Sequence, residues 1–156
     1  MIKHRESGST LIEVVVVAAI LSLVSLSFLG TFAALSSFHE KNQRAIKGLL
    51  LAEEGLEAVR LIKSGNWNDL AIIPPGSTRY LILSPLSWSI TISPEIIDGI
   101  FYRSIRVFKV MRDINDDIVS SGGTIDLDTL RFESSVSWSV RNATATVSYE
   151  AYMTDI

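Results

Sequence analysis

The 156-residue chain contains no cysteine and two histidines. Without cysteine no disulfide can staple the fold, although this absence does not identify a cellular compartment. His4 lies near the N-terminus and His39 follows a long apolar segment, so the sequence offers no His–Cys–carboxylate cluster for catalysis. It also contains no phosphate-binding loop and no nucleophile elbow. We therefore predict that the protein is not an enzyme and has no cofactor, apart from a calcium ion considered below.

The charge balance is mildly acidic, with 14 Lys and Arg against 17 Asp and Glu and a net charge of −3 at pH 7. Such a chain has no overall attraction for nucleic acid. Basic side chains do recur at every third position of one segment, namely Arg103, Arg106, Lys109 and Arg112. On a helix they would form a stripe able to contact DNA, but Ile105, Val107 and Phe108 between them favour a strand. A strand divides the basic residues over both faces, so we expect no nucleic-acid partner.

Charged residues are missing altogether from Val14 to Leu35. A helix of that length spans roughly 33 Å, enough to cross the hydrocarbon core of a bilayer. Three serines interrupt the apolar run, but their hydroxyls can bond to carbonyls of the preceding turn: Ser22, Ser25 and Ser27. The segment therefore predicts a membrane-spanning helix.

This segment differs from a cleaved secretory signal, in which small residues follow the apolar run. Here the small residues, Ser7-Gly8-Ser9, precede it, so cleavage there would keep the helix as an anchor. Basic residues stand on both sides of the span, namely Lys3 and Arg5 before it and Lys41, Arg44 and Lys47 after it. The positive-inside rule therefore leaves the orientation open.

The short basic leader, Gly8, and the stretch Ser9-Thr10-Leu11-Ile12-Glu13 before the apolar run resemble the type IV prepilin motif. Type IV pilins share this motif with the pseudopilins of type II secretion and competence systems. The resemblance implies a prepilin peptidase that cuts after Gly8 on the cytoplasmic side and methylation of the new N-terminus at Ser9. It also implies an inner-membrane precursor with its N-terminus inside, and a surface or periplasmic filament after assembly. The implied partners are the peptidase, other pilin subunits and an inner-membrane assembly platform.

Two positions depart from the usual form of this motif. Ser9 stands where the family usually has phenylalanine, and Gly30 falls where many pilins have a helix-breaking proline. Glycine inside a helix costs roughly 1 kcal/mol relative to alanine. We therefore predict a soft point in the helix at Gly30.

Glu13 is the one carboxylate beside the apolar run, and an ionisable group in lipid is costly. Cleavage after Gly8 would create an ammonium group at Ser9. The resemblance implies that Glu13 pairs with this N-terminal amine of a neighbouring subunit, and such a pair is favourable in low dielectric only when both partners are well placed. The alternative is an interfacial glutamate that interacts favourably with the helix dipole.

A polar-faced helix continues beyond the membrane segment, from His39 to Lys63, and Ser64-Gly65 gives a stop signal. Its apolar residues follow steps of three and four expected of one helical face: Ile46, Leu49, Leu50, Ala52, Leu56, Val59 and Ile62. We predict one helix from Ser9 to Lys63. The expected segments are a leader at 1–8, a membrane and filament-core helix at 9–37, its amphipathic continuation at 38–65, and a β-rich globular domain at 66–156.

After the loop at Pro74-Pro75-Gly76 the chain turns to short β-rich runs, at 78–83, 88–92, 101–111, 131–140 and 143–153. The last two alternate apolar and polar residues, as antiparallel strands covered on one face do. Arg141-Asn142 between them predicts a hairpin turn. The fold class is therefore α+β, a long N-terminal helix packed on an antiparallel sheet, which is also the pilin architecture.

An Asp-rich segment begins like a calcium-binding loop, and its candidate ligands are Asp113, Asn115, Asp117, Asp126 and Asp128. The pattern then fails, because Ile118 replaces the required glycine and Thr124 stands where the bidentate glutamate belongs. The alternative is a solvated hairpin loop that runs through Gly122-Gly123.

Together these features predict a structural filament subunit, a minor pilin or pseudopilin of a type IV pilus or type II secretion-like filament. One alternative is a major pilin of the same class. Another is a signal-anchored surface protein with a β-rich binding domain.

Overall fold

The computed structural model describes residues 9–141 and 143–155, with side chains from Leu11 onward. The chain forms two compact units, Met1–Gln43 and Arg44–Ile156. The boundary falls inside the first helix, α1 (Ser9–Gly65), which is continuous and ends two residues beyond the predicted Lys63. The second half of α1 thus belongs to the same unit as the β-sheet. The proposed four-segment division of the chain stays a prediction.

Within the first unit α1 is an uninterrupted helix of apolar residues. Hydroxyl groups bond to carbonyl oxygens one turn earlier, as predicted for Ser22, which donates to Ala18 O (2.7 Å), and Ser27, which donates to Leu23 O (3.0 Å). These bonds satisfy polar groups that a bilayer could not solvate. By length and composition α1 is the one helix of the described residues able to cross a membrane.

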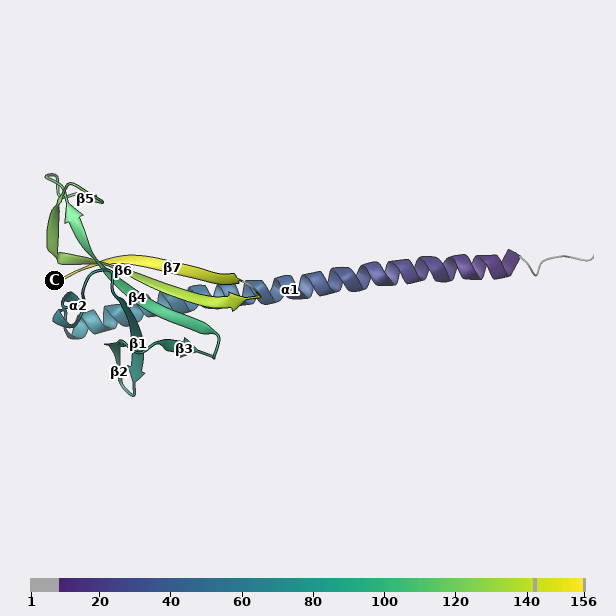
Figure 1. Cartoon of the computed structure of the whole chain (residues 1–156), viewed down its shortest axis with the longest axis horizontal. Coiled ribbons are helices and arrows are strands. Elements are labelled where there is room, and N and C mark those ends of the chain that lie inside the picture. Colours follow the sequence, from purple (N-terminus) through teal and green to yellow (C-terminus); the bar gives the residue numbers. More distant parts are fainter. Residues whose placement is uncertain (1–8, 142, 156) are drawn as a thin grey trace, which may run out of the picture. The chain divides into compact units, whose positions relative to one another are not determined.

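The second unit holds a seven-stranded antiparallel sheet in the order β2-β1-β4-β6-β7, in which β3 and β5 pair with β4 (Figure 1). Its strands are β1 (Thr78–Ser84), β2 (Ser87–Thr91), β3 (Glu95–Ile97), β4 (Phe101–Arg112), β5 (Ile118–Val119), β6 (Thr124–Val140) and β7 (Ala143–Thr154). A short helix, α2 (Asn68–Ala71), precedes the sheet. The predicted α+β fold is confirmed.

The five strands expected from the sequence are all present, and β6 begins seven residues earlier than its predicted start at residue 131. The pattern missed three short elements, α2, β3 and β5. Each is too short to show a periodic pattern. β3 and β5 form because each of them pairs with the long strand β4. α2 is held in place by Leu70, whose side chain is fully buried in the apolar core.

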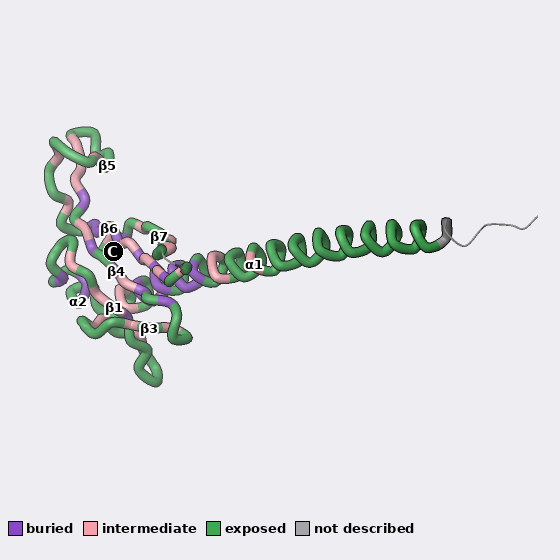
Figure 2. Tube along the Cα trace, turned by 45° about the vertical axis from the view of Figure 1, so that its right-hand side comes forward, coloured by how far each residue is buried: buried purple, intermediate pink, exposed green. Residues whose placement is uncertain are grey.

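The second half of α1 covers one face of the sheet, and the buried residues of both lie between them (Figure 2). They form two apolar clusters, one around Leu56, Val59 and Phe132 and one around Leu51, Ala52 and Trp138. The predicted helical face was partly wrong, because Ile46, Leu49 and Leu50 are exposed. The buried face instead passes through two glycines, Gly48 and Gly55.

The glycines bring α1 unusually close to the sheet. A Cβ at Gly48 would lie 2.6 Å from the ring of Trp138, and one at Gly55 would lie 2.3 Å from Ser134 Oγ. Real Cβ atoms essentially never approach so closely. The helix therefore packs against β6 through small residues, and the larger side chains of Ile46, Leu49 and Leu50 face solvent.

The β6–β7 hairpin follows its predicted alternation. Phe132, Ser134, Val136 and Trp138 are buried on one face of β6. On the corresponding face of β7 Met153 is buried, but Tyr149 remains 42% exposed because this edge strand is only partly covered. Arg141 at the turn has φ 50°, the left-handed conformation required by tight hairpin turns. Asn142, the second predicted turn residue, lies outside the described residues.

Candidate assembly site

The N-terminal end of α1 carries the residues predicted to direct processing and assembly. Gly8 lies outside the described residues, and Ser9 is the first residue of the helix. Glu13 follows one turn later, flanked by the exposed side chains of Ile12 and Val14. The structure thus places a carboxylate on a regular helix within one turn of the predicted new N-terminus. It shows no partner chain, so the predicted pairing of Glu13 is not tested.

From Val14 to Leu35 the surface of α1 carries no charge, and it is largely apolar on every side. Large side chains project outward all around the helix: Leu11, Ile12, Val14, Val15, Val16, Val17, Ile20, Leu21, Leu23, Val24, Leu26, Phe28, Leu29, Phe32, Leu35 and Phe38. A helix that is hydrophobic all round is stable only when lipid or other protein surrounds it. This segment therefore has to be covered by lipid or by other protein.

Gly30 lies within this helix, and α1 passes through it without interruption. A Cβ added there would meet no atom within 4 Å in the described structure. Unlike Gly48 and Gly55, Gly30 is therefore not required by packing within the chain. The predicted soft point at Gly30 stays a prediction.

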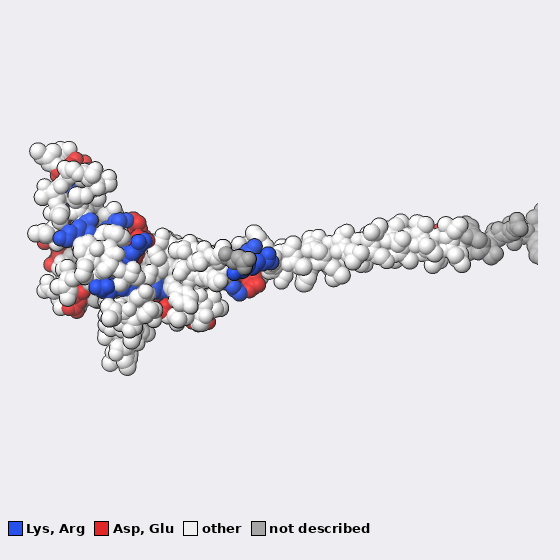
Figure 3. All heavy atoms as spheres, in the orientation of Figure 1, with Lys and Arg blue, Asp and Glu red and all other residues white. Residues whose placement is uncertain are grey.

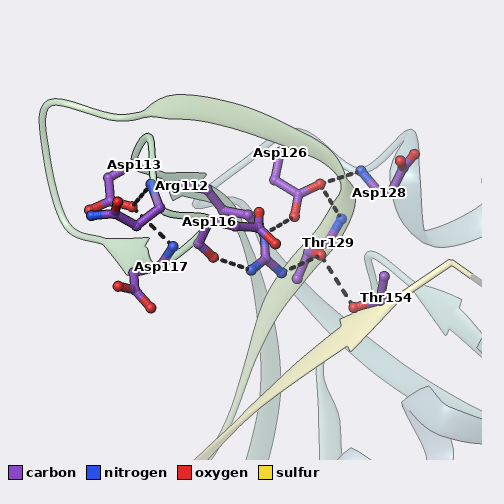
Figure 4. Close-up of polar contacts among 9 residues, drawn as sticks. Arg112, Asp113, Asp116, Asp117, Asp126, Asp128, Thr129 and Thr154 are labelled. Atoms are coloured by element: carbon purple, nitrogen blue, oxygen red, sulfur yellow. Dashed lines mark hydrogen bonds and ion pairs between the residues drawn. The ribbon is translucent and has the colours of Figure 1, made fainter.

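A second candidate site is the Asp-rich hairpin that joins the C-terminal end of β4 to the N-terminal end of β6 (Figure 4). Asp113 Oδ1 accepts hydrogen bonds from the backbone N–H of Asn115 (2.8 Å) and Asp117 (3.0 Å). Asp126 Oδ1 accepts from the backbone N–H of Asp128 (2.9 Å) and of Thr129 (3.2 Å). The acidic side chains therefore organise the turns at which they stand.

Arg112 connects the two sides of this hairpin. Its Nε donates to Asp126 Oδ2 (2.7 Å), Nη1 donates to the carbonyl oxygen of Asp116 (2.8 Å), and Nη2 donates to Thr129 Oγ1 (3.5 Å). The hydrogen bond from Arg112, followed by those from Thr129 and Asp128, lowers the pKa of Asp126 from 3.8 to about 2. The same ion pair raises the pKa of Arg112. Both groups are thus charged over the physiological range and hold the hairpin together.

These contacts bear on the predicted calcium ligands. Of the five residues, Asp113 and Asp126 already use side-chain oxygens in bonds within the hairpin. Among residues 11–141 and 143–155, no three His, Cys, Asp or Glu side chains are grouped closely enough to hold a metal ion. Calcium binding at Asp113, Asn115, Asp117, Asp126 and Asp128 stays a prediction from sequence.

The basic residues of segment 103–112 lie on β4, as the sequence predicted. Arg103 faces α1 and is buried, with 1% of its surface exposed, whereas Arg106 lies on the opposite face of the strand and is exposed. Arg103 donates to both carboxylate oxygens of Glu95 (2.8 and 2.7 Å) and to Leu51 O (3.2 Å). Arg103 and Glu95 therefore form a structural ion pair next to the core. The regular spacing of the basic residues in the sequence did not reveal this role.

Comparison with known families gives one match. The model of the prokaryotic N-terminal methylation motif matches residues 3–29, which include Gly8, Ser9 and Glu13. Neither the curated proteins nor the solved structures give a match to the chain. The match covers the N-terminal part of the chain, and the fold adds a long apolar helix followed by an antiparallel sheet.

The chain carries the signature of the type IV pilins and pseudopilins. The motif implies processing by a prepilin peptidase and assembly into filaments with other pilins. The apolar helix and the motif both fit a protein anchored in the inner membrane.

Proposed function

We propose that this chain is a minor pilin or pseudopilin of a type IV pilus or type II secretion-like filament. In this proposal the precursor sits in the inner membrane with its N-terminus inside. It is cut after Gly8 and methylated at Ser9, and an inner-membrane platform then extracts it into a helical filament. The observation that carries the proposal is the methylation motif at the head of an apolar helix whose large side chains are exposed.

The surface of the helix is suited to a membrane and to a helical filament core alike. Its first half needs a hydrophobic environment on all sides, which a bilayer or a bundle of identical helices equally supplies. Its second half is covered on one face by the sheet and displays Ile46, Leu49 and Leu50 on another. A subunit whose helix has exposed apolar residues along both halves is suited to packing against neighbouring helices.

Glu13 gives this packing a register. A carboxylate in low dielectric is strongly unfavourable without a partner, and the cleaved N-terminus of a neighbour provides an ammonium group at the right end of the helix. Misplaced neighbours would leave both charges unpaired. In the proposal Glu13 therefore selects one alignment of adjacent helices.

A major pilin is the second candidate from the same class, because the motif and fold are shared. The assignment to a minor pilin or pseudopilin rests on the stretch LAEEGLEAVRLIKSGNW at 51–67, which resembles the corresponding helix of minor pilins and secretion pseudopilins. The four segments, leader 1–8, core helix 9–37, amphipathic helix 38–65 and globular domain 66–156, belong to this proposal.

The deciding experiment is the intact mass and N-terminal sequence of the protein recovered from its native membrane and from sheared surface fibres. We expect a chain that begins at methylated Ser9. Cells without prepilin peptidase provide the control, in which the chain should begin at Met1. A chain that still begins at Met1 in cells with an active peptidase would overturn the proposal in favour of a signal-anchored surface protein.

A further inference from the structure

The two ends of the sheet in the second unit differ in charge. One end carries the acidic arm, defined here as residues 113–128, which extends beyond the rest of the sheet (Figure 1). Its base lies beyond the break in the register of β4 and β6, where Lys109 pairs with Leu130 but Val110 pairs with Asp126 and Arg112 pairs with Thr124. The arm has five acidic residues: Asp113, Asp116, Asp117, Asp126 and Asp128. Arg112 at its base lies within ion-pair distance of two of them, Asp116 and Asp126, so the arm keeps a net negative charge.

The arm also exposes large apolar side chains. Ile114 at its tip is 100% exposed and Leu127 is 77% exposed, and Ile118 and Ile125 are about half exposed. These residues stand among the carboxylates, so the arm combines apolar contact area with strong negative charge. Exposed apolar residues gathered in this way are typical of interaction sites.

Contacts within the chain hold the arm in place. Arg112 ties Asp126 to Asp116 and Thr129, and Thr129 Oγ1 lies 3.2 Å from Thr154 Oγ1 on β7. The backbone N–H of Asp155 donates to Asp128 O (2.8 Å). The arm is therefore organised before any partner binds, which reduces the entropy lost on docking.

The opposite end of the sheet is basic. There the β6–β7 turn carries Arg141, and Val140 and Ala145 pack in the same cluster as Ala45 of α1. Arg44 and Lys47 flank Ala45, and Asp98 forms an ion pair with Lys47. Figure 3 shows Lys and Arg side chains gathered over α1 near the end of this hairpin, with acidic side chains beside them. We call Arg44, Lys47 and Arg141 the basic end.

We propose that the acidic arm of one copy docks on the basic end of a second copy, so that successive copies contact head to tail. The inference rests on the proposed function as a filament subunit, and it requires that two copies of this chain be neighbours in the filament, as in a filament built from this pseudopilin or, for the second candidate, this major pilin. A contact between two different surfaces of the same chain generates an open array when its rotation does not close. A two-fold dimer through either end would bring like charges together, whereas the head-to-tail contact pairs opposite ones.

An anionic membrane is a weaker explanation of the charges. It would account for the basic end, but not for the acidic arm at the opposite end of the sheet or for the exposure of Ile114 and Leu127. Single exposed ion pairs contribute little to affinity, so the charges mainly set the orientation while the apolar side chains supply contact area. Only a second copy accounts for both ends of the domain.

Disulfide cross-linking in assembled filaments tests the contact, because the chain contains no cysteine of its own. The test variant is Ile114→Cys with Ser139→Cys, expressed as the full chain in native cells, because Ser139 is exposed on the same hairpin and its replacement keeps Arg44, Lys47 and Arg141. We expect oxidation of sheared filaments to give a ladder of multimers. The control is Ile92→Cys with Ser139→Cys, since Ile92 is 77% exposed but lies outside the arm, and it should give no ladder.

A charge exchange provides the second measurement. Asp117→Lys with Asp128→Lys changes two exposed side chains of the arm and leaves the Arg112 contacts intact. We expect it to lower the amount of the chain in filaments about fivefold or more, and Arg44→Glu with Arg141→Asp in the same chain to restore most of the loss. These changes test a pairing of charges, since a purely structural defect would not be rescued.

The outcomes separate this inference from the proposed function. Filaments that contain the wild-type chain but give no ladder with the test variant, or no rescue by charge exchange, would overturn the head-to-tail contact and leave the proposed function standing. Failure of the processed wild-type chain to enter any filament would overturn both.

Discussion

Gly55 of α1 lies directly over Ser134 of β6, so that a Cβ at position 55 would come 2.3 Å from Ser134 Oγ. The Ser134 hydroxyl is fully buried and has no hydrogen-bond partner among the described residues. Buried Arg103 and Ile105 border the same spot, 3.2 and 3.3 Å from that Cβ position. At this position α1 and β6 therefore meet through a glycine and a buried hydroxyl group rather than through large apolar side chains.

Replacing Gly55 with alanine should destabilise the domain. The added methyl has to displace Ser134 or lift the helix, and overpacking of this kind costs about 1–3 kcal/mol. The measurement is the thermal unfolding midpoint of the detergent-solubilised full chain, followed by tryptophan fluorescence. Gly30→Ala is the matched control, because its Cβ meets nothing and alanine favours a helix.

Removing the Ser134 hydroxyl should relieve the same clash. Ser134→Ala by itself removes a buried unsatisfied group and should leave stability unchanged or raised. In the double variant Gly55→Ala with Ser134→Ala we expect a smaller loss than the sum of the single changes. Additive effects would show that the two residues do not limit the approach of the helix.

The Arg103–Glu95 pair should be worth more than the exposed ion pairs. Arg103 is buried and joins β3 to Leu51 O of α1, with its guanidinium 5.3 Å from the Trp88 ring. Glu95→Ala leaves that buried cation with only the longer ion-pair contact to the half-exposed Glu54 (3.5 Å), which costs up to about 3–5 kcal/mol. The same unfolding measurement should show a large drop for Glu95→Ala and a much smaller one for the exposed pair variant Glu57→Ala. Equal drops would contradict the structural role of Arg103.

The acidic arm should loosen at low pH. The folded chain lowers the pKa of Asp126 from 3.8 to about 2, so its ion pair with Arg112 stabilises the fold fully above about pH 4. That contribution is lost as the pH falls from about 4 through about 2. Unfolding midpoints measured from pH 6 to 2 should show this loss for the wild type. Asp126→Asn should lack that part of the pH dependence, whereas Asp117→Asn, an exposed residue of the same arm, should keep it.

Glu13→Ala should separate anchoring from assembly. The change makes the helix more apolar, so membrane insertion should be unaffected. If Glu13 pairs with a neighbouring N-terminus, the variant should enter filaments about tenfold less or worse, since breaking a buried charge pair is strongly unfavourable. Quantitative immunoblots of membrane and sheared fractions measure both, with Val14→Ala as control. Undiminished incorporation would contradict the pairing role.

The fold could be predicted because its long elements are periodic. The structure reproduces three features predicted from the sequence: the long uncharged helix, the alternation of residues along β6 and β7, and the turn at Arg141. The buried face of α1 could not be predicted in full, since patterning weighs large apolar residues and the contact uses Gly48 and Gly55. A glycine on a helix gives no sign of which neighbour requires it.

The candidate sites were predicted unevenly for a related reason. Gly8, Ser9 and Glu13 are recognised from a local motif, which needs no tertiary information. The roles of Arg103 and Arg112 depend on partners distant in sequence, Leu51 and Asp126 among them, so a regular spacing of basic residues could not distinguish a core ion pair from a surface stripe.

The register break between Lys109 and Val110 has a consequence for how such a domain can vary. Pairing of β4 with β6 is continuous from Tyr102 to Lys109 and starts anew beyond the break. Residues can therefore be added to, removed from or exchanged in the arm without shifting any pair of the inner sheet. The sequence of the inner sheet, which packs against α1, and the sequence of the arm are therefore free to diverge at different rates.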